Sequence, residues 1–163
     1  MLADWLLAND LEPGVVGVDV TNADVEGVAA MLRHPAPIVS NSDAGAHLQM
    51  MCATGDTTLF LTRHVRDRAD FGLEAAVWQL TGRQATTLGM TDRGVLRPGA
   101  VADLTVFALD ELHWDQEEFV TDLPGGGARF RRPPGGYRYT VTAGEVTQER
   151  DALTGARPGR LVT

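Results

Sequence analysis

The stretch from Pro37 to His47, with the sequence PIVSNSDAGAH, sets the strongest limits on how this chain can fold. Proline followed by β-branched residues favours a strand over 37–40, and the polar residues after it favour a loop. If this strand belongs to a parallel sheet, Asp43 would lie just beyond its C-terminal end, where parallel-sheet enzymes place catalytic groups. Asp43 could bind a metal, act as a general base, cap a helix or close a turn, and the structural roles are the commoner ones.

Length and composition indicate one domain with a substantial core. The chain has 163 residues, 44% of them hydrophobic, and this excludes disorder over most of its length. Its net charge of -8 would repel a phosphate backbone, so we expect no nucleic-acid partner. An acidic N-terminus without a membrane-length apolar run, together with the single cysteine Cys52, leads us to expect no membrane association and a cytoplasmic location.

The first half of the sequence alternates predicted strands with amphipathic helices. Apolar residues at helical spacing predict helices over 2–8, 24–33, 58–68, 73–80 and 84–88. β-branched residues predict a strand over 15–20, which would form a right-handed βαβ unit with the strand over 37–40. A capping pattern runs from Thr21 to Asp24, and Pro35 should end the helix that follows it.

Glycine and proline become frequent after about residue 90, and the apolar runs shorten. This change predicts a strand over 102–107 and a hairpin of 137–141 with 145–148, in which Gly144 takes positive φ. The turn-rich residues 113–136 are predicted to form a surface excursion. We therefore divide the chain into an α/β part, residues 1–90, and a β part, residues 91–163.

Three segments resemble the C-terminal portion of amidohydrolase-superfamily enzymes, most closely the N-acyl-D-amino-acid deacylase (D-aminoacylase) branch. Ser42-Asp43 after a short apolar run resembles the acid at the end of the last barrel strand. The most specific segment, from Leu80 to Phe107, is similar to the stretch where such enzymes leave the barrel for a small β-sandwich. The sequences VTAGEV at 141–146 and TGARPG at 154–159 are similar to the C-terminal ending of this branch.

The resemblance implies an α/β fold, with the last strand-helix units of a (β/α)8 barrel followed by a C-terminal β-sandwich portion. It implies hydrolysis of the amide C–N bond of a small-molecule N-acyl (D-)amino acid or related amide, with zinc as cofactor. Asp43 would be the catalytic base and proton donor, and in some relatives a metal ligand. Ser42 and His47 would contact substrate, although His47 could instead support a neighbouring group or the loop itself.

The other metal ligands that the resemblance implies are absent from the sequence. The family draws on a His-x-His pair, a bridging residue and two further histidines, whereas none of the histidines here stand at such spacings: His34, His47, His64 and His113. A complete barrel needs about 250 residues. We therefore expect an incomplete barrel, the last quarter to third of an enzyme, which is inactive without the remainder.

Two alternatives to a hydrolase fragment stay open. One is a local zinc chelate from Asp43, His47 and Cys52, which the spacing does not enforce. The other is a non-catalytic structural or oligomerising domain of the same ancestry. Exposed apolar edges predict a homo-oligomer or association with a missing N-terminal portion.

His64 is expected on a solvated helix face, and the arginines at 129, 131 and 132 are expected to pair with nearby acids.

Overall fold

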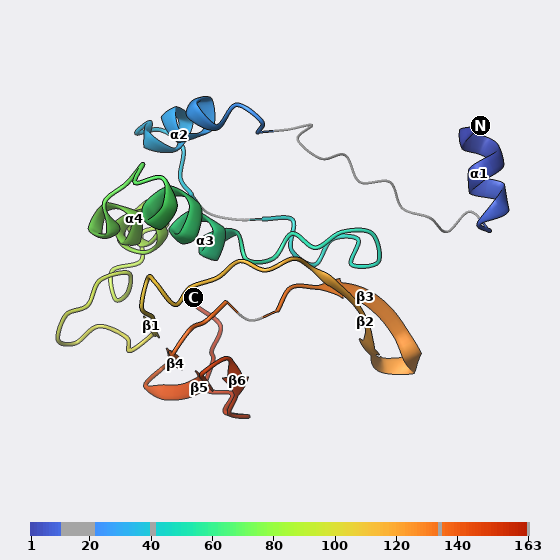
Figure 1. Cartoon of the computed structure of the whole chain (residues 1–163). Helices are drawn as coiled ribbons and strands as arrows, with labels where there is room; N and C mark the ends of the chain where they lie inside the picture. Colours follow the sequence, from blue (N-terminus) through green and yellow to red (C-terminus); the bar gives the residue numbers. More distant parts are fainter. Residues whose placement is uncertain (11–21, 40–41, 134, 163) are drawn as a thin grey trace.

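The computed structural model describes residues 1–10, 22–39, 42–133 and 135–162. Its α-helices and its π-helix come from the first part of the chain and its strands from the second, as Figure 1 shows. A short 3-10 helix, Pro124–Gly126, also lies in the second part. The helices are α1 (Leu2–Ala8), α2 (Val25–Arg33), α3 (Asp56–Leu59), the π-helix η1 (Phe60–Asp67), α4 (Leu73–Leu80) and α5 (Gly82–Thr87). No helix in these ranges is both long and apolar enough to cross a membrane.

Helix α2 confirms the helix predicted over 24–33. Its N-cap is Asp24, whose carboxylate accepts a hydrogen bond from the backbone N–H of Gly27 at 2.9 Å. The expected cap at Thr21 lies outside the described residues. The helix ends at Arg33 because His34, which precedes a proline, takes an extended conformation with ψ of 142°.

The prediction of a strand over 37–40 is wrong for residues 37–39, which belong to no sheet. The predicted strand over 15–20 and residue 40 lie outside the described residues, and the described residues 37–39 supply no strand for the expected βαβ unit. A strand needs a neighbour to satisfy its backbone groups. Instead, the carbonyl of Val39 accepts a hydrogen bond from the side chain of Gln84, and Val39 packs against the core.

The core joins the helices to the residues that follow β1. Phe60, Leu61 and Val65 of η1 are buried with Ala76 of α4 and with Leu112, which is only 1% exposed. Partly buried side chains from both halves of the chain surround this cluster: Leu32, Val39, Phe71, Leu80, Phe107, Leu109 and Tyr137. The predicted helices over 58–68 and 73–80 are confirmed as α3 with η1 and as α4, and their apolar faces build most of this core.

The strands within the described residues form two separate antiparallel sheets. One contains β1 (Leu104–Val106), β4 (Tyr139–Thr142), β5 (Glu145–Glu149) and β6 (Ala152–Leu153), in the order β1-β4-β5-β6. The predicted hairpin is confirmed, since Ala143 and Gly144 turn β4 into β5 with φ of 49° and 85°.

The second sheet is the hairpin of β2 (Glu118–Leu123) and β3 (Gly127–Arg131). It arises within residues 113–136, which were expected to be only a turn-rich excursion. The turn around Gly125 and Gly126, both with positive φ, closes this hairpin. The barrel and the β-sandwich implied by the resemblance stay predictions.

Candidate functional site

Asp43 lies in an irregular loop, residues 42–55, that leads into α3. Its side chain is exposed, and no described residue donates a hydrogen bond to its carboxylate. The backbone around it is ordered by successive turns: the carbonyl of Asp43 accepts from Ala46 N–H at 3.0 Å, and that of His47 accepts from Met50 N–H at 2.7 Å. The loop therefore presents a carboxylate that no described residue engages, on a hydrogen-bonded backbone.

Ser42 and His47 lie in the same loop as Asp43. The Ser42 hydroxyl is half-buried and accepts a hydrogen bond from Ala44 N–H at 3.2 Å, which closes a local turn. His47 is exposed and takes a left-handed conformation with φ of 48°. The structure brings all three predicted site residues onto one loop, and their contacts with a substrate stay predictions.

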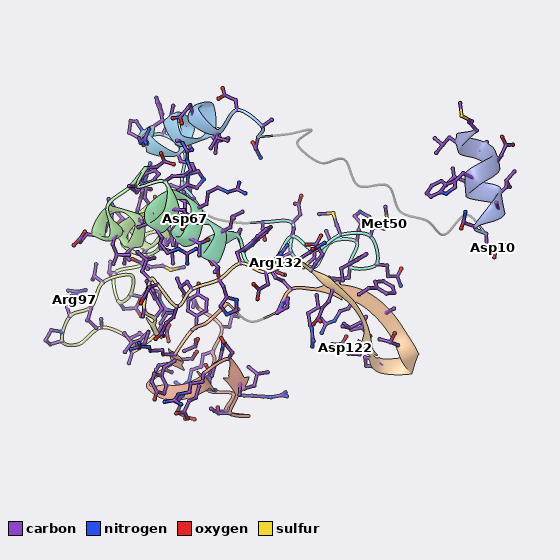
Figure 2. All side chains as sticks on the ribbon, in the orientation of Figure 1. Asp10, Met50, Asp67, Arg97, Asp122 and Arg132 are labelled. Carbon is purple, nitrogen blue, oxygen red and sulfur yellow. The ribbon has the colours of Figure 1, made fainter. Side chains whose placement is uncertain are left out.

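The loop that carries Asp43 is attached to the β2–β3 hairpin. Leu48 accepts a hydrogen bond through its carbonyl from Phe130 N–H of β3 at 2.7 Å. Just after β3, the Arg132 guanidinium donates to the carbonyls of Thr54 at 2.9 Å and Cys52 at 3.4 Å. Figure 2 labels Arg132 at the base of the hairpin and Met50 on the loop, and Figure 1 shows the loop running beside β2 and β3.

Arg132 is buried, with only 6% of its side chain exposed. Its guanidinium carbon lies 3.7 Å from the centre of the Trp114 ring, a cation–π contact. It also pairs with Glu117 at 3.1 Å and donates to the carbonyl of Asp115. The expectation that this basic cluster pairs with nearby acids is confirmed, since Arg129 and Arg131 also form ion pairs, with Asp122 and Glu118 respectively.

A second charged cluster joins α2 to η1. The carboxylate of Asp70 is 6% exposed and accepts hydrogen bonds from His64 Nδ1 at 2.9 Å and Arg68 Nε at 2.8 Å. Arg33 of α2 reaches the other oxygen at 3.0 Å, and Arg68 also pairs with Glu26 at 2.7 Å. Arg68 and then His64, as hydrogen-bond donors, hold the pKa of Asp70 below its usual range.

The prediction that His64 lies on a solvated face is wrong. Its side chain is 7% exposed and its ring packs 5.9 Å from that of Phe60. Helical spacing of four from Phe60 and three from Leu61 could have indicated burial, but the neighbouring arginines suggested a solvated surface. The ion pairs of Arg33 with Asp70 and of Arg68 with Glu26 bind α2 to the end of η1, so we assign this cluster a structural role.

The described residues do not supply a zinc site on their own. They contain no group of three or more His, Cys, Asp or Glu side chains placed to hold a metal ion. The alternative chelate from Asp43, His47 and Cys52 is therefore not formed, and the Cys52 thiol lies 3.0 Å from the Thr54 hydroxyl instead. Asp43, His47 and Cys52 are suitable ligand types, but they are not placed to hold a zinc ion, and we derive no catalytic step through one.

One hollow of about 500 Å³ lies away from the Asp43 loop. It is lined by residues around β4 and β5: Glu111, Gly136, Tyr137, Arg138, Tyr139, Arg150 and Asp151. Arg138 is already paired with Glu111 at 2.6 Å, and Asp151 accepts from the backbone of Tyr137 at 3.0 Å. Two pairs of its lining residues are thus engaged with one another, and we keep the Asp43 loop as the candidate site.

Comparison with known sequences identifies the family. A sequence model of the amidohydrolase family matches residues 4–148. The chain belongs to the amidohydrolase family. The match covers the Asp43 loop, the core and most of the strands, whereas no solved structure matches the chain.

Two curated proteins of Alcaligenes xylosoxydans xylosoxydans are similar to this amidohydrolase chain. D-aminoacylase is 34% identical over 102 residues, which are 63% of this chain and 19% of that protein. N-acyl-D-glutamate deacylase is 30% identical over 146 residues, 82% of this chain and 28% of that protein. The matched segments thus span about a fifth of the length of the first relative and little more than a quarter of the second.

Proposed function

We propose that this amidohydrolase chain supplies the catalytic carboxylate, Asp43, of an enzyme that hydrolyses the amide C–N bond of N-acyl amino acids, including D-amino acids. The similarity to two deacylases supports the reaction class. The observation that carries the assignment is the exposed carboxylate of Asp43, which no described donor engages, on a loop whose backbone is tied down by hydrogen bonds. A general base must be accessible yet fixed.

The proposed chemistry is a proton relay through one carboxylate. Asp43 accepts a proton from the water whose oxygen attacks the carbonyl carbon, and it returns that proton to the leaving nitrogen as the C–N bond breaks. The products are a carboxylate and a free amine. We propose Ser42 and His47 as the loop residues nearest to the bound N-acyl amino acid.

The proposed enzyme is complete only with groups from outside the described residues. The family resemblance implies zinc, and the Asp43 loop does not hold one, so its ligands would come from a further part of the protein or from a partner. We propose a cytoplasmic enzyme that acts on small amides rather than nucleic acid, consistent with the net charge of -8.

The test is a chimera with the more fully matched relative. The segment of N-acyl-D-glutamate deacylase that aligns with this chain is replaced by this chain, and hydrolysis of N-acetyl-D-amino acids is measured. We expect the chimera to be active and the Asp43→Asn variant to lose about 10²–10⁴-fold in kcat. The matched control is Asp67→Asn, which alters an exposed carboxylate paired with the adjacent Arg66.

Two results would contradict the proposal. An Asp43→Asn chimera with undiminished kcat would remove Asp43 from the chemistry. A folded chimera without activity would favour the alternative, a non-catalytic structural or oligomerising domain. The chain alone is assayed in parallel for bound zinc and for hydrolysis, because activity of the isolated chain would show that no further ligands are needed.

A further inference from the structure

We infer that Arg132 is a positioning residue for the loop that carries Asp43, holding residues 42–55 in place from the base of the β2–β3 hairpin. This inference rests on the proposed function for the role of Asp43. Its own evidence is the set of contacts that one buried guanidinium makes to a segment about 80 residues earlier in the chain.

The guanidinium of Arg132 is engaged on all of its nitrogens. Nε donates to the carbonyl of Thr54 at 2.9 Å, and Nη2 donates to the carbonyl of Cys52 at 3.4 Å and to Glu117 at 3.1 Å. Nη1 donates to the carbonyl of Asp115. A planar fork can bind several carbonyls at fixed angles, whereas an ammonium cannot reproduce that geometry.

The surroundings of Arg132 leave little room for another arrangement. Its guanidinium stacks on Trp114, and Gly55 packs against both side chains. A Cβ at Gly55 would lie 3.0 Å from Arg132 Cδ and 3.1 Å from Trp114 Nε1, and its φ of +84° also favours glycine. Gly55, the last residue of the loop, thus packs closely against the arginine that binds the loop.

Between this anchor and Asp43, a series of backbone hydrogen bonds orders the loop. From the adjacent strand, Phe130 N–H binds the carbonyl of Leu48 at 2.7 Å. Met50 and Met51 N–H bind the carbonyl of His47 at 2.7 and 3.1 Å, and Ala46 N–H binds that of Asp43 at 3.0 Å. Release of the anchor should therefore loosen the turns that place Asp43.

The anchor is separate from the main core. The buried cluster draws on η1, α4 and Leu112, and includes no residue of 42–55 or of the hairpin. Loss of Arg132 should consequently loosen the loop more than it unfolds the protein. This separation makes the positioning role measurable apart from global stability.

Cys52 reports on the loop directly, because it is the only cysteine in the chain. We would measure the rate at which a thiol reagent labels Cys52, and the amide exchange of Met50 and Met51, in the full chain and in Arg132→Ala. At temperatures below the unfolding transition, we expect both rates to be at least tenfold higher in Arg132→Ala than in the full chain without the substitution. Arg131→Ala is the matched control, since it removes the neighbouring exposed arginine, which among the described residues pairs with Glu118 and Asp122 and not with the loop.

Arg132→Lys tests geometry against charge. If the planar guanidinium geometry matters, Arg132→Lys restores less than half of the protection of Cys52 from labelling that Arg132→Ala loses. Rates in Arg132→Ala within twofold of those in Arg131→Ala, or full protection by lysine, would overturn the inference.

Asp43→Asn should leave the labelling rate unchanged, so failure of the proposed chemistry and failure of the anchor are distinguishable. In the active chimera, Arg132→Ala should lower kcat at least tenfold with less than threefold change in KM, and an unchanged kcat would refute positioning.

Discussion

The Nδ1 atom of His64 lies 2.9 Å from Oδ2 of Asp70, and both side chains are almost fully buried. Because a carboxylate can only accept, His64 donates this hydrogen bond. Asp70 also binds Arg33 of α2 and Arg68, so one carboxylate joins two helices through three donors. A buried carboxylate with that many charged partners should be costly to remove.

Asp70→Asn should destabilise the fold, because it removes the negative charge that faces Arg33 and Arg68 and replaces one of the two acceptor oxygens with an NH2 donor. We expect a fall in Tm on the order of 10 °C by differential scanning calorimetry. Asp67→Asn is the matched control and should change Tm by less than about 2 °C, since Asp67 is exposed and pairs with Arg66 beside it. Equal effects of the two variants would contradict the structural role of the cluster.

Stability should fall with acid through Asp70. Its pKa is lowered in the folded state by Arg68 and His64, so the unfolded chain binds the proton more readily. The contribution is present above the unfolded pKa of about 3.9 and is lost as pH falls through the lower folded pKa. Thermal melts between pH 6 and pH 2 should show Tm declining below about pH 4, with a shallower decline in Asp70→Asn. Parallel declines would show that Asp70 is not responsible.

Leu112→Ala should cost about 2–5 kcal/mol of unfolding free energy, since it empties a fully buried site between η1 and the strands. The control is Leu153→Ala, where the side chain is 84% exposed and the expected change is within about 0.5 kcal/mol. Urea unfolding followed by circular dichroism measures both. A small effect at Leu112 would mean that the core does not join the two halves of the chain.

Ala143→Asn should stabilise the β4–β5 hairpin. Ala143 takes φ of 49° ahead of Gly144, and Asn tolerates this left-handed conformation better than alanine. The Ala143 N–H that binds Asp103 at 2.8 Å is retained. We expect a gain of about 0.5–1 kcal/mol, measured as a rise in the urea midpoint. Gly144→Val should lower the urea midpoint instead, and a rise in the midpoint of that variant would contradict the assigned turn.

Self-association is expected from the apolar side chains that α2 leaves exposed. Ala29 is buried, whereas Val25 and Met31 are 37% and 53% exposed. We propose that a homo-oligomer covers this face, and sedimentation velocity should show a species larger than a monomer. Met31→Glu should shift that species toward monomer, while Leu153→Glu, on the distant strand β6, should not. A monomeric chain at all concentrations would refute the proposal.

Local patterns in the sequence determined most of the helices and the β4–β5 hairpin. Apolar residues at helical spacing and Pro35 placed α2, and Gly144 placed the turn, because each signal acts within a few residues. The exposed loop around Asp43 also followed from its polar residues and Gly45. The same local reasoning failed for residues 37–39, whose strand would depend on partners elsewhere in the chain.

Only the tertiary structure decided which charged residues are buried. His64 beside two arginines, and Arg132 among three, resemble solvated surface in the sequence. Their partners are distant or face them only after folding: Arg132 meets Cys52 across 80 positions, and Arg33 meets Asp70 across 37. Burial of a charge depends on whether such distant groups converge to replace water around it, and sequence spacing does not encode that convergence.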